Sequence, residues 1–181
     1  MVKDLKTLPE DIYSILEGKS LFDTAVVDRF GESLKDVLHK RLKQEDRKPV
    51  LRMSNLGRPL RQLYYELNEV PSEKISGKTL VKFAYGELCE ALVIALAEAA
   101  GHEASRFQEE LEVDGVKGHI DLVLSGYLVD VKSCSAYSFQ KFKDGSLLLP
   151  GNDPFAYVVQ LKSYAKTLGL PAAWVAFDKV S

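Results

Sequence analysis

The sequence predicts a single α/β domain with a mixed sheet, together with a helical N-terminal region. Two observations support this class. A long stretch rich in Ala, Leu and Glu, typical of a helix, precedes short apolar runs that are separated by turn dipeptides such as Asp-Gly. The 181 residues also suffice for one domain with a sizeable core. We therefore divide the chain into a helical, basic region (residues 1–78) packed on an α/β core (residues 79–181).

The N-terminal region is expected to contain two helices followed by a basic stretch. A proline in the first turn and a glycine at the end delimit the first helix, residues 9–18. Ser20 and Asp23 resemble a capping box, which opens a second helix that extends to about residue 43. Residues 35–61 are rich in Lys and Arg, as a solvated helix face and loop would be.

The core is expected to contain a long helix, a three-stranded meander, a second helix and a final strand. In chain order these elements are the helix Thr79–Ala100, the strands Phe107–Val113, Val116–Leu124 and Tyr127–Lys132, the helix Pro154–Leu168 and the strand Ala172–Phe177. Asp114-Gly115 and Ser125-Gly126 mark the two turns of the meander. We expect residues 133–153 to form a long loop.

Composition argues against several classes of protein. The formal net charge of −2 is unsuited to coating nucleic acid by bulk charge, although it is compatible with a local basic patch. The two cysteines, Cys89 and Cys134, cannot form a disulfide framework or supply four ligands to an iron–sulfur cluster. We see no signal-peptide core and no apolar stretch long enough for a bilayer, so we expect a cytoplasmic protein without a membrane partner.

Two aspartates and a lysine interrupt the apolar strands of the meander. Side chains alternate along a strand, so Asp130 and Lys132 share one face, and Asp121 joins them if the faces match across the turn. Two carboxylates in a partly dry place repel each other and tend to hold a proton. Mg²⁺ would remove that conflict, because it prefers one or two carboxylates plus water. A structural Asp–Lys ion pair is the alternative interpretation.

Two further pairs of polar residues lie on the predicted helices. Glu87 and Glu90 follow Gly86 on the long helix, and Glu90 has largely apolar neighbours at helical spacing. Helical geometry alone does not decide which of these acids is functional. Gln160 and Tyr164 are four residues apart and therefore share one face of the second core helix.

In this order, the patterns G-x-x-x-E, G-x-x-D, D-x-K and Q-x-x-x-Y resemble the PD-(D/E)XK nuclease superfamily, in particular its RecB-like branch with Cas4-like and phage exonucleases. The matching residues are Gly86 and Glu90, Gly118 and Asp121, Asp130 and Lys132, and Gln160 and Tyr164. The resemblance covers about residues 80–177 and implies a restriction-endonuclease-like core, in which helices flank a mixed central sheet. The chain departs from many relatives at Glu90, where they carry histidine, and at Ile120, where the superfamily name implies proline.

The resemblance implies hydrolysis of phosphodiester bonds in DNA with one or two Mg²⁺ or Mn²⁺ ions and no iron–sulfur cluster. The implied metal ligands are Glu90, Asp121, Asp130 and the backbone carbonyl of Val131. Lys132 is implied to orient the attacking water and to offset charge in the transition state. Gln160 and Tyr164 are implied to line the site and to position the DNA backbone or Lys132.

Aromatic and basic residues outside these motifs suggest where DNA would bind. The expected loop mixes Tyr137, Phe139 and Phe142 with Lys141, which suits stacking on bases and binding of phosphates along a single strand. A hydrophobic flap packed on the core is the alternative. Arg58 and Arg61 could hold a terminal phosphate with two hydrogen bonds each.

We therefore expect a DNA exonuclease that acts on a single-stranded or free end during DNA processing or recombination. A phage origin would place it in the host cytoplasm. Two alternatives remain open: a structure-specific or restriction-type endonuclease, and an inactive DNA-binding module on a nuclease fold. The acid–acid–lysine set argues against the inactive module.

Overall fold

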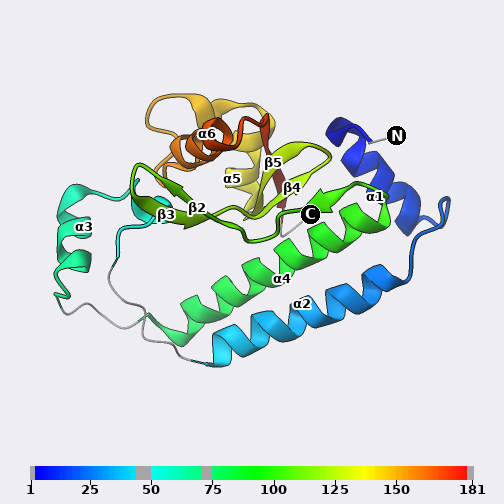
Figure 1. Ribbon diagram of the computed structural model, residues 1–181, viewed down its shortest axis with the longest axis horizontal. Helices are drawn as coiled ribbons and strands as arrows, with labels where there is room; N and C mark the ends of the chain where they lie inside the picture. The colour runs from blue at the N-terminus through cyan, green and yellow to red at the C-terminus, as the bar shows by residue number, and fades with distance from the viewer. Residues whose placement is uncertain (1–2, 44–49, 71–74, 179–181) are drawn as a thin grey trace. The chain divides into compact units, whose positions relative to one another are not determined.

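The computed structural model describes residues 3–43, 50–70 and 75–178. This part of the chain is α/β, with a mixed four-stranded sheet of order β1-β4-β5-β6 and a separate antiparallel pair, β2-β3 (Figure 1). The helices are α1 (Leu8–Leu16), α2 (Ala25–Leu42), α3 (Leu60–Leu67), α4 (Gly77–Ala99), α5 (Ala136–Lys143) and α6 (Tyr157–Leu168). The strands are β1 (Ala104–Ser105), β2 (Glu110–Val113), β3 (Val116–His119), β4 (Leu122–Leu124), β5 (Tyr127–Cys134) and β6 (Ala172–Asp178).

The chain forms two compact units. The first contains the described residues of 1–45, 75–105 and 123–127, and the second those of 46–74, 106–122 and 128–181. Each unit thus draws on both sides of the division that we place at residue 78. Residues 44–49 of the predicted basic stretch lie outside the described residues. No helix in the described ranges is long and apolar enough to cross a membrane.

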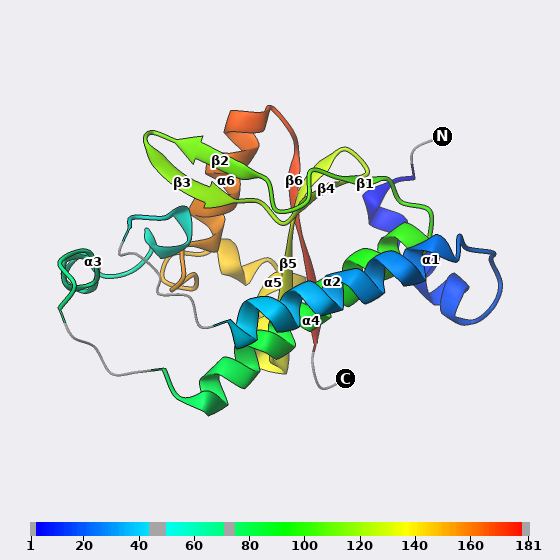
Figure 2. The same ribbon diagram turned by 60° about the horizontal axis from the view of Figure 1, so that its bottom comes forward.

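In the first unit, α2 and α4 lie side by side and run in opposite directions (Figures 1 and 2). Ion pairs join their surfaces, from Arg41 to Glu87 at 2.6 Å and from Arg29 to Glu98 at 3.4 Å. The predicted long helix is confirmed, although it begins two residues earlier, where the Ser76 hydroxyl accepts a hydrogen bond from a backbone N–H.

The start of α2 differs from the predicted capping box. The Ser20 hydroxyl lies 2.9 Å from that of Ser14, so it does not cap the helix. The Asp23 carboxylate instead accepts a hydrogen bond from the N–H of Ala25 at 2.9 Å, and α2 begins at Ala25. The helix therefore starts with an aspartate turn in place of a reciprocal box.

In the second unit, the predicted hairpin is confirmed. Asp114 and Gly115 both have a left-handed backbone, with φ of 50° and 78°, as a tight two-residue turn between β2 and β3 requires. In the four-stranded sheet, β5 and β6 pair in parallel from Leu128 and Ala172 to Cys134 and Asp178, and Figure 2 shows both strands running in the same direction. Leu128, Val129 and Val131 of β5 are buried, and Val129 and Val131 lie on the face of the strand opposite its polar residues Asp130 and Lys132.

The predicted strand Val116–Leu124 is wrong, because it is two strands. β3 pairs with β2, whereas β4 pairs with the short β1 in the other sheet. The segment between β1 and β2 explains this break. Arg106 and Gln108 in that segment both have a left-handed backbone, which bends the chain between the two sheets. Asp121 therefore lies at the corner where the chain leaves the hairpin, so strand alternation does not carry its face across to β5.

The predicted loop over residues 133–153 is also wrong in part. It contains α5 and a short 3₁₀ turn, Ser146–Leu148. The Ser135 hydroxyl accepts a hydrogen bond from the N–H of Ser138, which fixes the first turn of α5. The aromatic and basic residues of this segment are thus placed by a helix.

Candidate functional site at the corner of β4 and on β5

The candidate site is built around an aspartate and a lysine two residues apart on β5. The Lys132 ammonium lies 2.6 Å from a carboxylate oxygen of Asp130. Both side chains are largely buried, with 21% of Lys132 and 18% of Asp130 exposed. Their shared face follows from strand alternation, as the sequence predicts. Ion pairing in such a place is stronger than at an open surface, because water screens it less.

Asp121 reaches β5 through a backbone hydrogen bond. Its carboxylate accepts the N–H of Val131 at 2.7 Å, between the two polar residues of that strand. Burial, followed by the negative charge of Asp130, raises the pKa of Asp121 to about 6, against the opposing effect of Lys132. The predicted convergence of Asp121 with Asp130 and Lys132 is confirmed, although it arises from the corner and not from matched strand faces.

Lys132 keeps its proton in this environment. Burial alone would lower its pKa, but the charges of Asp130 and Asp121 outweigh that effect, so the pKa is raised overall. The ammonium also lies over the ring of Tyr157, at 4.9 Å from the centroid. A cation above an aromatic face is stabilised by the ring's electron density, which fixes the direction of the lysine side chain.

Tyr164 packs against the glycine of the G-x-x-D motif. A Cβ at Gly118 would overlap the Tyr164 hydroxyl and would come within 2.8 Å of the Cβ of Met53. The hydroxyl is buried and makes no hydrogen bond with any described residue. Burial raises the pKa of Tyr164, and the negative charges of Asp130 and Asp121 add to the rise. Tyr164 therefore lies close enough to the acidic pair to be part of its surroundings.

These residues fit a hydrated divalent cation better than a fully protein-bound metal. No group of three or more His, Cys, Asp or Glu side chains suited to a metal occurs in the described part of the chain. Mg²⁺ commonly uses only one or two carboxylates and keeps several waters, and oxygen donors also suit Mn²⁺. Asp121 and Asp130 supply those carboxylates, and their mutual repulsion would be relieved by a cation. The unpartnered Tyr164 hydroxyl could bond to such a water.

The two acids of α4 belong to the first unit and have different surroundings. Glu87 accepts a hydrogen bond from Arg41 at 2.6 Å and lies 3.2 Å from the ammonium of Lys40. Its charge is thus balanced by α2. Glu90 is half-buried on the same helix. The assignment of Glu90 as a metal ligand stays a prediction, and Glu87 has an evident structural role.

The two arginines predicted to hold a terminal phosphate already contact other side chains. Arg58 forms an ion pair with Glu66 of α3. The Arg61 guanidinium donates to the Tyr65 hydroxyl at 3.2 Å and lies over its ring. Both are exposed at the start of α3. Phosphate binding by Arg58 would therefore compete with Glu66.

The predicted DNA-binding aromatics fall into two groups. Tyr137 is 76% exposed on α5, with the Lys141 ammonium 5.1 Å from its ring. Phe142, by contrast, packs edge-on against Trp174 at 5.8 Å, and Phe139 is half-buried. The hydrophobic-flap alternative therefore describes Phe142, whereas Tyr137 remains available to a ligand.

Sequence reasoning missed Tyr157, which lies beside Lys132. Asp153, a residue type common at helix starts, was the available signal, because it accepts hydrogen bonds from the N–H groups of Tyr157 and Val158 at 3.0 and 2.8 Å. We expected the helix to begin at Pro154, but it begins at Tyr157, after a left-handed Ala156. That displacement of the helix start puts Tyr157 over the lysine.

No family model, no curated protein and no solved structure matches the chain.

Proposed function

We propose that the chain is a metal-dependent DNA nuclease, and specifically an exonuclease that acts on a single-stranded or free end. The observation that carries this proposal is the convergence of Asp121, Asp130 and Lys132. Two largely buried carboxylates beside a protonated lysine are costly for a purely structural cluster, since apolar side chains of the same volume would avoid the desolvation penalty. The four motifs in superfamily order add support from the sequence.

The residues divide the chemistry among themselves. Asp121 and Asp130 would hold the cation, with Glu90 and the carbonyl of Val131 as further proposed ligands. The chemistry supplied by a bound Mg²⁺ or Mn²⁺ is stabilisation of charge at the phosphate and activation of water. Lys132 would donate a hydrogen bond to the attacking water or to the phosphate oxygen on which charge develops.

The supporting residues hold this arrangement in place. The backbone N–H of Val131 fixes one carboxylate oxygen of Asp121, and the ring of Tyr157 orients Lys132. Tyr164 packs against Gly118, and in the proposal Tyr164 and Gln160 line this side of the site. Such fixed donors and charges need little rearrangement when the transition state forms.

A single assay tests the proposal. End-labelled linear DNA and circular DNA are incubated with Mg²⁺, with Mn²⁺ or with EDTA, and Asp130→Asn protein purified in the same way controls for contaminating nucleases. Metal-dependent loss of linear DNA alone identifies an exonuclease, whereas cutting of circular DNA identifies an endonuclease. Binding of DNA without cutting in either metal would refute the nuclease proposal and leave the inactive module.

A further inference from the structure

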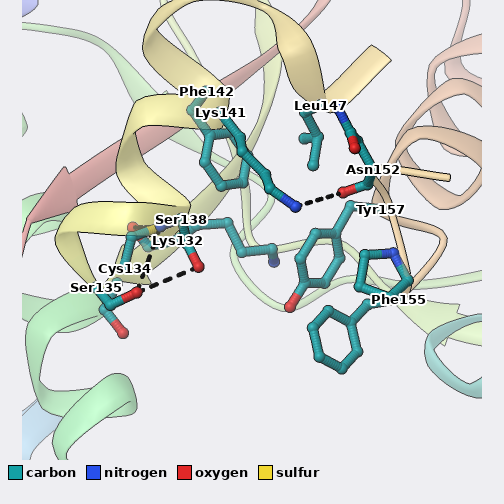
Figure 3. Close-up of a pocket in the computed structure, with 12 residues that line it drawn as sticks. Lys132, Cys134, Ser135, Ser138, Lys141, Phe142, Leu147, Asn152, Phe155 and Tyr157 are labelled. Atoms are coloured by element: carbon teal, nitrogen blue, oxygen red, sulfur yellow. Dashed lines mark hydrogen bonds between the residues drawn. The ribbon is translucent and has the colours of Figure 1, made fainter. Parts of the chain in front are cut away.

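A pocket of about 140 Å³ in the second unit is lined by Lys132 and continues along α5 (Figure 3). Its walls come from the end of β5, from α5 and from the segment that leads into α6. Its polar lining residues are Lys132, Ser133, Ser135, Ser138, Lys141 and Asn152. The pocket is therefore rich in hydrogen-bond donors and shares Lys132 with the candidate catalytic cluster.

The charge in this pocket is unbalanced. Two lysines line it and no acidic residue does. Lys132 is paired with Asp130, but the Lys141 ammonium donates only to the backbone carbonyl of Asn152, at 3.2 Å, and makes no ion pair with a described carboxylate. A partly enclosed cation next to neutral hydroxyls favours an anionic ligand.

The size of the pocket limits what that anion can be. At roughly 30 Å³ per water molecule, the volume corresponds to about five waters. It suits one phosphate group and is too small for a whole nucleotide, whose base must lie outside. Two exposed aromatic rings lie near the pocket and could contact such a base. Phe155 lines the pocket and is 63% exposed, and Tyr137 is 76% exposed beside Lys141.

We propose that this pocket binds one phosphate of a single-stranded nucleic acid, with Lys141 as the counter-charge and Tyr137 and Phe155 as stacking surfaces for adjacent bases. Sequence-tolerant binding of single strands commonly combines such phosphate contacts and aromatic rings. The assignment rests on the proposed function in one respect, namely that the bound phosphate belongs to the strand being cut.

The binding test uses fluorescein-labelled oligo(dT) in EDTA, so that no cleavage takes place. Lys141→Met should weaken binding about tenfold, as expected for one charge-assisted hydrogen bond. It should also lower the slope of log affinity against log salt by about 0.7, the contribution of one phosphate contact on a single strand. Lys143→Met is the matched control, because Lys143 lies on the same helix but does not line the pocket. Equal losses in the two variants would overturn the proposal.

Neutral phosphate analogues then identify the contact itself. A series of oligonucleotides carries a single methylphosphonate at successive positions. One position should weaken binding to the wild-type protein but cause no further loss with Lys141→Met. Additive losses at every position would show that Lys141 contacts no single phosphate. Displacement of oligo(dT) by inorganic phosphate at similar affinity, in the wild type only, would mean a free-phosphate site and would also overturn the strand assignment.

The pocket and the nuclease can fail separately. Lys141-dependent binding without any metal-dependent cutting would refute the nuclease and leave the pocket intact. Cutting with an unchanged KM for Lys141→Met would refute the pocket and leave the nuclease intact. If both hold, Lys141→Met should raise KM with a smaller effect on kcat, because it removes binding common to the ground and transition states.

Discussion

The hydroxyl of Tyr164 occupies the space that a side chain at Gly118 would need. This contact links two of the short motifs, G-x-x-D and Q-x-x-x-Y, through a close packing requirement. It also explains why the residue three positions before Asp121 has no side chain. The Tyr164 hydroxyl is buried and has no hydrogen-bond partner among the described residues. Its burial therefore lowers the stability of the fold, because the hydroxyl loses its hydrogen bonds to water without replacement.

Gly118→Ala should therefore lower the free energy of unfolding by about 1–3 kcal/mol or more, the usual cost of overpacking a core. Gly31→Ala is the control, because Gly31 lies within α2 with nothing near its missing Cβ, and there alanine should be neutral or stabilising. Tyr164→Phe in the Gly118→Ala background should restore part of the lost stability, because it removes the hydroxyl that the new methyl group would overlap. The restoration should be incomplete, because Met53 still lies close to that methyl group. Denaturant unfolding measures all three. An unaffected Gly118→Ala protein would contradict the close approach.

Asp121→Asn should stabilise the metal-free protein at neutral and alkaline pH. The pKa of about 6 lies above the ordinary value near 4, so the folded state binds more protons than the unfolded state between these values. This contribution to stability is full below pH ~4 and is lost as pH rises through ~6. Removing the charge should recover at most about 3 kcal/mol at pH 8, while the amide oxygen can still accept the Val131 N–H. Chemical unfolding in EDTA at pH 8 checks this, and a destabilised variant would show that Lys132 outweighs burial.

The sequence was sufficient for elements with strong local signals. The D-x-K strand, the Asp114-Gly115 hairpin and the long helix α4 each have a clear periodicity or turn dipeptide, and the structure has all three. The sheet change at Asp121 could not be predicted, because it depends on left-handed backbone at Arg106 and Gln108, where no glycine marks it.

The surroundings of Lys132 were only partly predictable. Ser135 could cap a helix at the start of α5. The aromatic and basic residues that follow it are as typical of a binding loop as of a helix, so the sequence did not predict α5. The sequence predicts a helix start at Pro154, yet the hydrogen bonds of Asp153 extend four and five residues along the chain to the N–H groups of Tyr157 and Val158. Long-range placement of a side chain over a neighbour is set by packing, which a local pattern does not contain.

The two acids of α4 should behave differently on substitution. Glu87→Gln should lower the free energy of unfolding by about 1 kcal/mol or more, because it removes a largely buried ion pair with Arg41 and a more exposed one with Lys40. It should leave cleavage largely intact. Glu90→Gln should abolish cleavage if it completes the metal ligands. Parallel measurement of unfolding and of metal-dependent cutting separates the two roles. The reverse ranking in activity would mean that the functional acid has been misassigned.

His102 should contribute a loss of stability as pH drops below about 6.5, opposite in sign to the contribution of Asp121. The His102 side chain is fully enclosed, with Nδ1 2.9 Å from the Ser125 hydroxyl and Nε2 3.2 Å from Asp11. Burial lowers its pKa, so below pH ~6.5 the unfolded state takes up a proton that the folded state resists. The slope of unfolding free energy against pH, at most about 1.4 kcal/mol per unit, should be reduced in His102→Gln. The exposed His119→Gln is the control, and equal slopes in all three proteins would contradict this.

Asp130 and Lys132 lie in contact on one strand but should fail in different ways. Asp130 is proposed as a metal ligand, so Asp130→Asn should lose both Mn²⁺ binding and hydrolysis. Lys132 acts in the proposal on the water and the phosphate, and its ammonium lies 2.6 Å from the Asp130 carboxylate, where it competes with a cation. Lys132→Ala should therefore bind Mn²⁺ as well as or better than the wild type, yet lose about 10²–10³ or more in rate, as removal of a preorganised donor does.

Calorimetric titration of Mn²⁺, alongside the linear-DNA assay, measures both properties for each variant. Lys132→Arg is a useful third protein, because it keeps the charge but changes the geometry of the donor and should recover little activity. Two results would be decisive against the proposal. Normal cutting by Lys132→Ala would make the pair a structural salt bridge, and unchanged Mn²⁺ binding by Asp130→Asn would move the metal away from β5.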